Sequence, residues 1–220
     1  MKILLSTSYL PPISYLSLFF QNGKMIMDQW EYFQKQSFRN RAYILSPQGL
    51  QLLTVPIQKD SRRKVPMGEV RISNEFNWQK IHWMSLQSCY RRSSYFEFYE
   101  DSFSKFYQKK YEFIWDFNED LLRFILSKYE MENIIFETTK EYKLENNFDI
   151  LDFRENIHPK KPLKFKSEPY SQVFNPQGLF QEKLSVLDLL FNHGKESRTY
   201  LKDLGRVFLH SMNLETRPRP

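Results

Sequence analysis

The first twenty residues of the chain place the strongest limit on what it can fold into. The segment Lys2–Leu5 is continuously apolar after its lysine, and a turn with hydroxyl residues and two prolines follows at Ser6–Pro12. Apolar residues return in Ile13–Phe20, where Pro12 is acceptable at the first turn of a helix. A short strand without apolar/polar alternation is typical of a strand that is buried on both faces. The sequence therefore predicts a buried first strand that leads through a tight turn into a short helix.

Apolar patterns and turn signals further along the chain predict more strands and helices. Further strands are predicted at Lys24–Met27 and Asn133–Glu137. The segments Arg41–Leu45 and Leu50–Ile57 flank a Ser-Pro-Gln-Gly turn, which predicts a hairpin. Helix-like spacing of apolar residues predicts helices at Asn77–Arg91, Tyr95–Lys109 and Asn118–Tyr129.

The end of the chain carries the clearest helix signal. Ser185 and Asp188 match a capping box, and Gly194 is a typical stop, so a helix is predicted between them. Two basic segments, Gln58–Arg71 and Tyr142–Lys166, are poor in such patterns, and we expect the first to be a loop or a lid.

These patterns together predict an α/β fold. We expect a mixed sheet of about five strands flanked by helices, with a helical middle region. The expected organisation is one domain over residues 1–215 and a frayed tail at 216–220, where the sequence reads Arg-Pro-Arg-Pro at its end.

Composition narrows the classes of partner and compartment. Of the 220 residues, 41% are hydrophobic and 17% aromatic, which is enough for a sizeable core. The chain has 6 glycines and neither a GxGxxG nor a Walker A pattern, and its net charge of +6 favours anionic partners. Cys89 is the single cysteine, so no disulfide framework is expected. No apolar stretch approaches the ~18 residues of a membrane span and no signal peptide precedes the first strand, so a cytoplasmic protein is predicted.

Two polar segments are candidates for a ligand site. The turn Ser6–Pro12 can offer hydroxyl and backbone N–H groups to a phosphate or carboxylate, although it can equally be a rigid connector. Lys35, Arg39, Asn40 and Arg41 form a run without acidic residues between Tyr32 and Gln58. Arginine forks and amides suit anionic ligands, whereas the alternative for such a run is a solvated loop.

His82 is the candidate general base. On a helix it shares a face with Trp78 and Leu86, and a histidine lined by aromatic side chains can take up a proton near neutral pH. The alternative is a core histidine whose nitrogens are hydrogen-bonded. Histidine spacing excludes a structural zinc site, and Asp28 and Asp188 are the carboxylates to consider for a transient Mg²⁺. The basic and aromatic residues around Tyr90 are few, so a nucleic-acid role is disfavoured.

Several segments, taken in order, resemble the WbqC-like protein family. The matching segments are Met1–Tyr15, Tyr32–Arg41, Leu53–Pro56, the helix around Trp78 to His82, and Tyr170–Phe174 with Leu184–Asn192. The chain departs from the family pattern at Thr7-Ser8, where the family usually has Gln-Pro. It departs again at Asp28, which stands alone where an acidic pair is common.

The resemblance implies a role in bacterial surface-polysaccharide (O-antigen) biosynthesis. The implied activity is transfer of an aminoacyl or similar small group to a nucleotide-linked or phosphorylated amino sugar. An adenylating or nucleotidyl-transferring site is disfavoured because the turn lacks the histidine pair of such enzymes. The alternative class is a non-catalytic binding or scaffold protein with an aromatic interaction surface.

On the enzyme hypothesis the site residues have distinct predicted roles. His82 would remove a proton from the acceptor and Asn40 would stabilise an oxyanion. An anionic substrate, a sugar nucleotide or a phosphate, would be bound by Ser8, Tyr9, Lys35, Arg39, Arg41 and Tyr90. We expect Tyr9, Lys35, Asn40, Arg41 and His82 to line one cavity. The cofactor and the oligomeric state stay open at this point.

Overall fold

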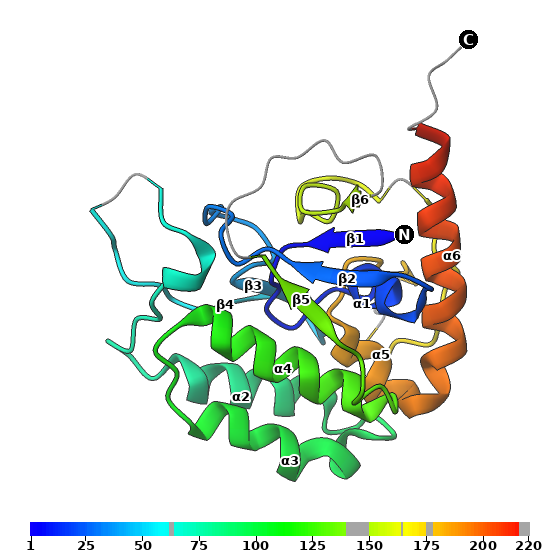
Figure 1. Cartoon of the computed structure of the whole chain (residues 1–220). Helices are drawn as coiled ribbons and strands as arrows, with labels where there is room; N and C mark the ends of the chain where they lie inside the picture. Colours follow the sequence, from blue (N-terminus) through cyan, green and yellow to red (C-terminus); the bar gives the residue numbers. More distant parts are fainter. Residues whose placement is uncertain (62–63, 140–149, 164, 175–177, 216–220) are drawn as a thin grey trace.

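A four-stranded parallel sheet forms the centre of the molecule. The computed structural model describes residues 1–61, 64–139, 150–163, 165–174 and 178–215. The strands are β1 (Lys2–Leu5), β2 (Lys24–Met27), β5 (Phe136–Thr138) and β6 (Ile150–Asp152), in the order β5-β2-β1-β6 (Figure 1). Ile3 and Leu5 of β1 are completely buried, which confirms the predicted buried first strand.

The remaining strands form a separate hairpin. β3 (Arg41–Ser46) pairs in antiparallel register with β4 (Gly49–Thr54), as the Pro/Gly turn predicts. Gly49 has a φ of 108°, which a residue with a Cβ rarely adopts. The α/β class is confirmed, but the strands are divided between two sheets instead of one mixed sheet. β6 was not predicted, because its three residues lie inside a charged segment with no longer apolar pattern.

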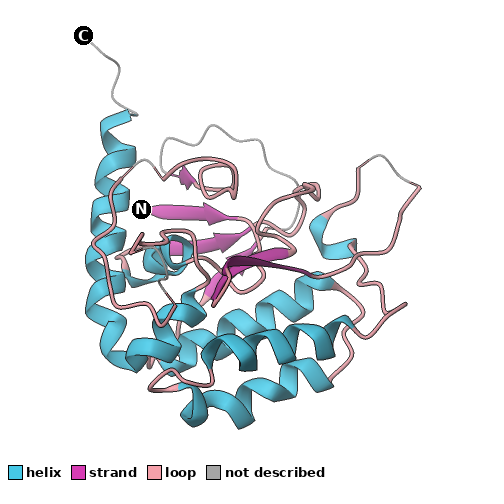
Figure 2. Cartoon of the chain, turned by 180° about the vertical axis from the view of Figure 1, so that it is seen from behind, coloured by secondary structure: helices cyan, strands magenta, loops and turns pink. Residues whose placement is uncertain are grey.

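The helices follow the predicted positions closely in the middle of the chain. They are α1 (Ile13–Ser17), α2 (Trp78–Tyr90), α3 (Phe96–Gln108), α4 (Ile114–Lys128), α5 (Val186–His193) and α6 (Arg198–Glu215). The helices α2, α3 and α4 lie together on one side of the molecule, and α6 runs along another (Figures 1 and 2). α4 begins four residues before its predicted start at Asn118, and α6 was not predicted at all. The predicted tail at 216–220 lies outside the described residues.

Local signals explain how the helix α5 begins and ends. The hydroxyl oxygen of Ser185 accepts a hydrogen bond from the backbone N–H of Leu187 at 3.2 Å, and Gly194 ends the helix with a φ of 58°. The Asp188 carboxylate does not complete the capping box, because it points into the protein and accepts a hydrogen bond from Tyr170. The predicted helix is confirmed. Asp188, the acidic position of the predicted capping box, has a different role.

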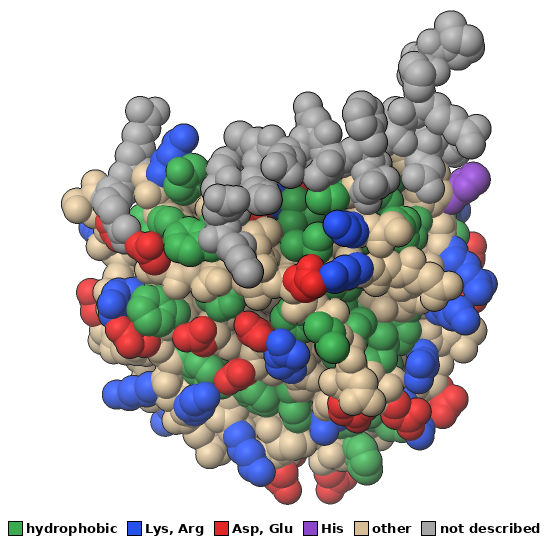
Figure 3. Space-filling view, viewed as in Figure 1, with side chains coloured by type: hydrophobic (Ala, Val, Ile, Leu, Met, Phe, Trp, Pro, Cys, Tyr) green, Lys and Arg blue, Asp and Glu red, His purple; other side chains and the backbone are tan. Residues whose placement is uncertain are grey.

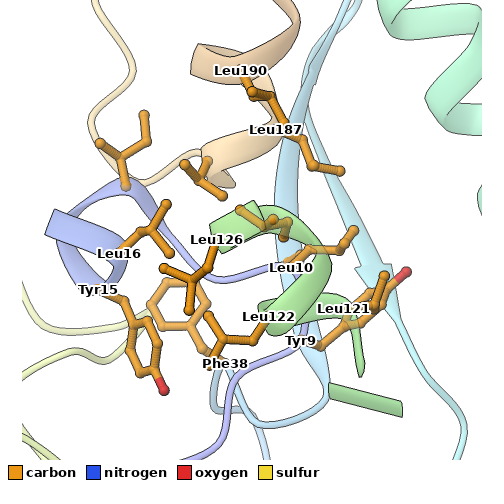
Figure 4. Close-up of a cluster of buried hydrophobic side chains, with 14 of the residues drawn as sticks. Tyr9, Leu10, Tyr15, Leu16, Phe38, Leu121, Leu122, Leu126, Leu187 and Leu190 are labelled. Carbon is orange, nitrogen blue, oxygen red and sulfur yellow. The ribbon is translucent and has the colours of Figure 1, made fainter. Parts of the chain in front are cut away.

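The core lies between the sheet, the hairpin and the helices. Figure 4 shows Leu121, Leu122 and Leu126 of α4 against Tyr9 and Phe38, which come from two loops. Leu187 and Leu190 of α5 close the same cluster, whose labelled residues are all buried. Loops as well as helices supply these buried side chains. Several of them are aromatic, among them Tyr9, Tyr15 and Phe38.

Gly205 allows α6 to approach α1 closely. A Cβ at this position would lie 2.3 Å from the backbone oxygen of Ser17. We expect Gly205→Ala to lower the free energy of unfolding by about 1–3 kcal/mol, because the clash outweighs the gain of about 1 kcal/mol in helix propensity. Thr199→Ala, at an exposed position of the same helix, is the control and should be neutral or stabilising. Urea unfolding of both variants measures the difference, and equal stabilities would contradict the close approach.

Candidate functional site

The strand order of the parallel sheet has a switch point beside β1. From β1, the next strands β2 and β5 are added on one side, whereas β6 is added on the other side. In open parallel sheets, ligands bind at the carboxyl ends of the strands at such a switch point. The segment Ser6–Ser8 follows β1, and Phe153 and Arg154 follow β6. The switch point therefore lies between the predicted turn and a segment that the sequence did not single out.

A narrow cleft is present at this position. It is lined by Ser6, Thr7 and Ser8 on one side and by Phe153 and Arg154 on the other, with Arg39 also contributing. The space inside it is about 10 Å³, roughly enough for one water molecule. A larger ligand can enter only if the loops on its two sides move apart.

Asp28 ties the carboxyl end of β2 to that of β6. Its Oδ1 accepts hydrogen bonds from the backbone N–H groups of Trp30 and Glu31 and from the Thr139 hydroxyl, at 2.8–3.1 Å. Its Oδ2 pairs with Arg154 Nη1 at 2.5 Å. Burial alone would lower the pKa of Arg154, but the hydrogen bonds and charges of Asp152 and Asp28 raise it. Asp28 is thus fully engaged with protein groups.

A buried ion pair lies directly behind the Ser6 turn. Glu31 and Arg39 are 5% and 3% exposed and make two hydrogen bonds, at 2.9 Å and 2.6 Å. The Ser6 hydroxyl donates to Glu31 Oε2 at 3.1 Å. Burial raises the pKa of the Glu31 carboxyl, while Arg39 and the Ser6 hydrogen bond lower it in part. The cleft is therefore connected through one hydroxyl group to a buried carboxylate.

Backbone strain occurs in the two loops that meet at this site. Leu10, in the turn after β1, has a φ of 40°, and Gln36, in the loop before Arg39, has a φ of 60°. Such angles are rare for residues with a Cβ, and above all for a bulky leucine, and cost about 1–3 kcal/mol each. Strain of this kind is often retained at functional sites, which agrees with a functional cleft here.

The predicted site residues do not gather in one place. Ser8 and Arg39 line the cleft, and the backbone N–H of Tyr9 binds Phe38 beside it. Lys35 instead lines a second cavity, of about 560 Å³, with Arg71. Arg39 binds Glu31 through Nε and Nη2, so a substrate anion in the cleft would have to use its remaining guanidinium N–H groups.

His82 and the ring of Tyr9 are in the core. Tyr9 is completely buried, and its hydroxyl group is 2.8 Å from His82 Nδ1 and 2.9 Å from the Tyr107 hydroxyl. The His82 ring packs edge-on against Trp78. Burial lowers the pKa of His82 to about 4, against the opposing effect of a hydrogen bond to the backbone of Thr54. His82 is therefore neutral at neutral pH, and this geometry favours a structural role.

Asn40 and Arg41 lie near His82, beside the end of β4. Asn40 Nδ2 donates to the backbone oxygen of Val55 at 2.9 Å, next in sequence to the Thr54 contact of His82. In the described part of the structure, Asn40 Oδ1 and Arg41 Nε are buried without a hydrogen-bond partner. These two atoms are the open polar groups of the predicted cluster.

Tyr90 belongs to a different region. It is buried against Phe191 of α5, with ring centroids 5.3 Å apart. Burial raises the pKa of Tyr90, and the charge of Asp188 raises it further. Tyr90 thus lies with α5 and away from the switch-point cleft.

Sequence reasoning missed Glu31 and Arg154. Glu31 follows the predicted strand Lys24–Met27 by only a few residues, so its place at the carboxyl edge was available as a signal. Arg154 had no such signal, because β6 was not predicted. Among the described residues, no group of three or more His, Cys, Asp or Glu side chains is placed to hold a metal ion.

The surface charges and the helix lengths bear on the classes of partner. On the face shown in Figure 3, basic and acidic side chains are interspersed over the described part of the chain. This face therefore offers no continuous basic surface of the kind that nucleic acids bind. No helix in the described ranges combines the length and the apolar character that crossing a membrane requires.

Comparison with known proteins identifies one family. A family model described as the WbqC-like protein family matches residues 7–161. A protein of Mycobacterium tuberculosis (strain ATCC 25618 / H37Rv), named "Uncharacterized protein Rv1507c", is 27% identical over 231 residues, covering 90% of this chain and 96% of the relative. No solved structure matches the chain. The relative's name states no activity, so the similarity concerns ancestry and not reaction.

Proposed function

Because this chain belongs to the WbqC-like protein family, we propose that it is a transferase of surface-polysaccharide biosynthesis. It moves an aminoacyl or similar small group onto the amine of a phosphorylated or nucleotide-linked amino sugar. The observation that carries the proposal is the contact between the Ser6 hydroxyl and the buried Glu31 carboxylate, on the wall of a cleft at the switch point of the sheet.

The reaction needs a group that accepts a proton from the acceptor amine. As the nitrogen attacks the acyl carbon, the leaving group departs with the electron pair of its bond to that carbon, and the nitrogen must lose a proton. Ser6 can take this proton while passing its own to Glu31 Oε2, because the hydrogen bond between them already exists. Burial, which raises the pKa of Glu31, makes the carboxylate a better proton acceptor than an exposed one.

Of the residues predicted from sequence, some take part in the proposed reaction and others do not. Ser8 lines the cleft, and its hydroxyl, which donates a long hydrogen bond to the Phe38 backbone oxygen at 3.4 Å, can turn to an anionic group of the substrate. The roles of His82 as general base and of Asn40 as oxyanion donor remain hypotheses, and the burial of His82 argues against the first.

Ligand binding tests the substrate class. We expect a nucleotide-linked or phosphorylated amino sugar to raise the melting temperature in a screen that also contains ATP and free amino acids, since a ligand held only by the folded state stabilises it.

Ser6→Ala should keep this shift in melting temperature and lose about 10²–10⁴-fold in transfer rate. The control Ser102→Ala changes a half-buried serine of α3 whose hydroxyl donates to the Tyr99 backbone oxygen in the same helix, and it should retain activity. Equal rates in the two variants would remove Ser6 from the reaction. A screen without any shift would favour the scaffold alternative.

A further inference from the structure

A further cavity, whose lining shares no residue with the switch-point cleft, lies where α5, α6 and the start of α3 meet. Its volume is about 520 Å³, within the usual range of small-molecule sites. Its lining includes the rings of Tyr95, Tyr170, His193 and Tyr200 and the carboxylate of Glu196. Neither the family match nor the proposed transferase chemistry assigns a role to it.

The rings of this cavity stand at steep angles to one another. Tyr170 lies 5.6 Å from His193 and 5.5 Å from Tyr200 between ring centroids, with interplanar angles of 84° and 74°. On another wall, the Tyr95 ring rests on Gly194, where a Cβ would come within 2.8 Å of it. Such edge-to-face contacts turn neighbouring rings in different directions, so a cation in the cavity can face more than one π-system. We call the four rings that line the cavity the cage.

The electrostatic environment favours a positive ligand. Asp188, 1% exposed, accepts a hydrogen bond from the Tyr170 hydroxyl at 2.7 Å. Its negative charge therefore lies at the hydroxyl end of the Tyr170 ring. Among the described residues that line the cavity, none is lysine or arginine. The neighbouring cations Lys195 and Arg198 are directed at Glu130, at 2.9 Å and 3.9 Å.

From this arrangement we propose that the cavity is a binding site for a small organic cation with an alkylammonium group, either quaternary or protonated. The rings supply cation–π contacts, and Glu196 and Asp188 supply negative charge. The proposal does not depend on the transferase assignment, because the residues of the cavity and those of the switch-point cleft are different.

Calorimetry on the full-length protein tests the charge requirement. Choline chloride and 3,3-dimethyl-1-butanol are titrated into the protein in separate experiments. The alcohol has nearly the same shape as choline but no charge. We expect choline to bind roughly 3- to 30-fold more tightly than the alcohol, the range that cation–π contacts provide. Equal affinities would show an unspecific apolar groove and overturn the proposal. Absence of choline binding at millimolar concentrations would also overturn it.

Two variants locate the binding site. Tyr200→Leu removes one wall and should weaken choline binding about 3- to 10-fold, whereas Tyr32→Leu, at an exposed tyrosine of a different loop, should leave it unchanged. Glu196→Gln changes an exposed side chain without removing a packed ring, and should weaken binding about 2- to 5-fold. If Tyr200→Leu does not fold, Glu196→Gln and the alcohol comparison decide the question. Unchanged choline affinity in a folded Tyr200→Leu or in Glu196→Gln would contradict the proposal.

Discussion

Replacing Arg39 with alanine is expected to lower the free energy of unfolding by about 3–5 kcal/mol. Arg39 and Glu31 are almost completely buried and hold each other through two hydrogen bonds. Without the guanidinium, Glu31 keeps the Ser6 hydroxyl as a neutral partner but loses the cation that offsets the cost of its burial. The loss is therefore that of an uncompensated charge in the interior, which is much larger than the loss of a surface pair.

Two further variants separate this explanation from a general packing defect. Arg123→Ala removes an exposed pair with Glu119 on α4 and should change stability by less than about 1 kcal/mol. The double variant Arg39→Met with Glu31→Leu replaces both charges by apolar groups and should recover most of the loss. Urea unfolding at pH 7 measures all three. If Arg39→Ala were no less stable than Arg123→Ala, the pair would have no structural importance.

Replacing His82 with glutamine is expected to lower stability by about 1–3 kcal/mol at pH 7 and to leave transfer activity per folded molecule unchanged. The Tyr9 hydroxyl is buried against His82 Nδ1, so an ill-fitting replacement leaves a buried polar group poorly paired. A general base at this position would instead cost about 10²–10⁴-fold in rate with the fold intact. Melting temperature and turnover on the same sample decide between the two. The control is His210→Gln, on the exposed side of α6.

The buried His82 also makes the stability of the wild-type protein depend on pH. Burial lowers the pKa of His82 from 6.5 to about 4, so between these values the unfolded chain binds a proton that the folded chain does not. The wild-type protein therefore loses stability from this group as the pH falls through that window. The pKa difference of about 2.5 units, at about 1.4 kcal/mol for each pKa unit, corresponds to roughly 3–4 kcal/mol of stability.

Asp188 acts in the opposite direction over nearly the same window. Burial raises its pKa from 3.8 to about 6, so the folded chain binds the proton first and gains stability as the pH falls. The two effects oppose each other in the wild-type protein. The informative quantity is therefore the difference between the wild type and His82→Gln, which should fall to about zero or change sign between pH 6.5 and pH 4, because the loss in this window is at least as large as the advantage at pH 7. A constant difference would contradict the burial of a neutral histidine.

Local patterns were sufficient for most of the secondary structure. The strand Lys2–Leu5, the hairpin and the helices α2 and α3 were predicted within a few residues. Each depends on apolar periodicity or on turn residues close together in the chain, and the surrounding fold reinforces those preferences. β6 escaped prediction because three residues carry no period, and its strand conformation depends on pairing with β1.

The sequence by itself determined the fold class and the family, and it singled out the turn Ser6–Pro12, whose first three residues line the cleft. Only the tertiary structure decided what each polar side chain faces. Arg39, which the sequence predicts to bind a substrate, is paired with Glu31 in the structure, and His82 meets Tyr9 across 73 positions of the chain. The reason is physical: burial and partner choice are set by contacts between distant segments. A histidine in water and one in the core have the same place in a sequence pattern but very different pKa values.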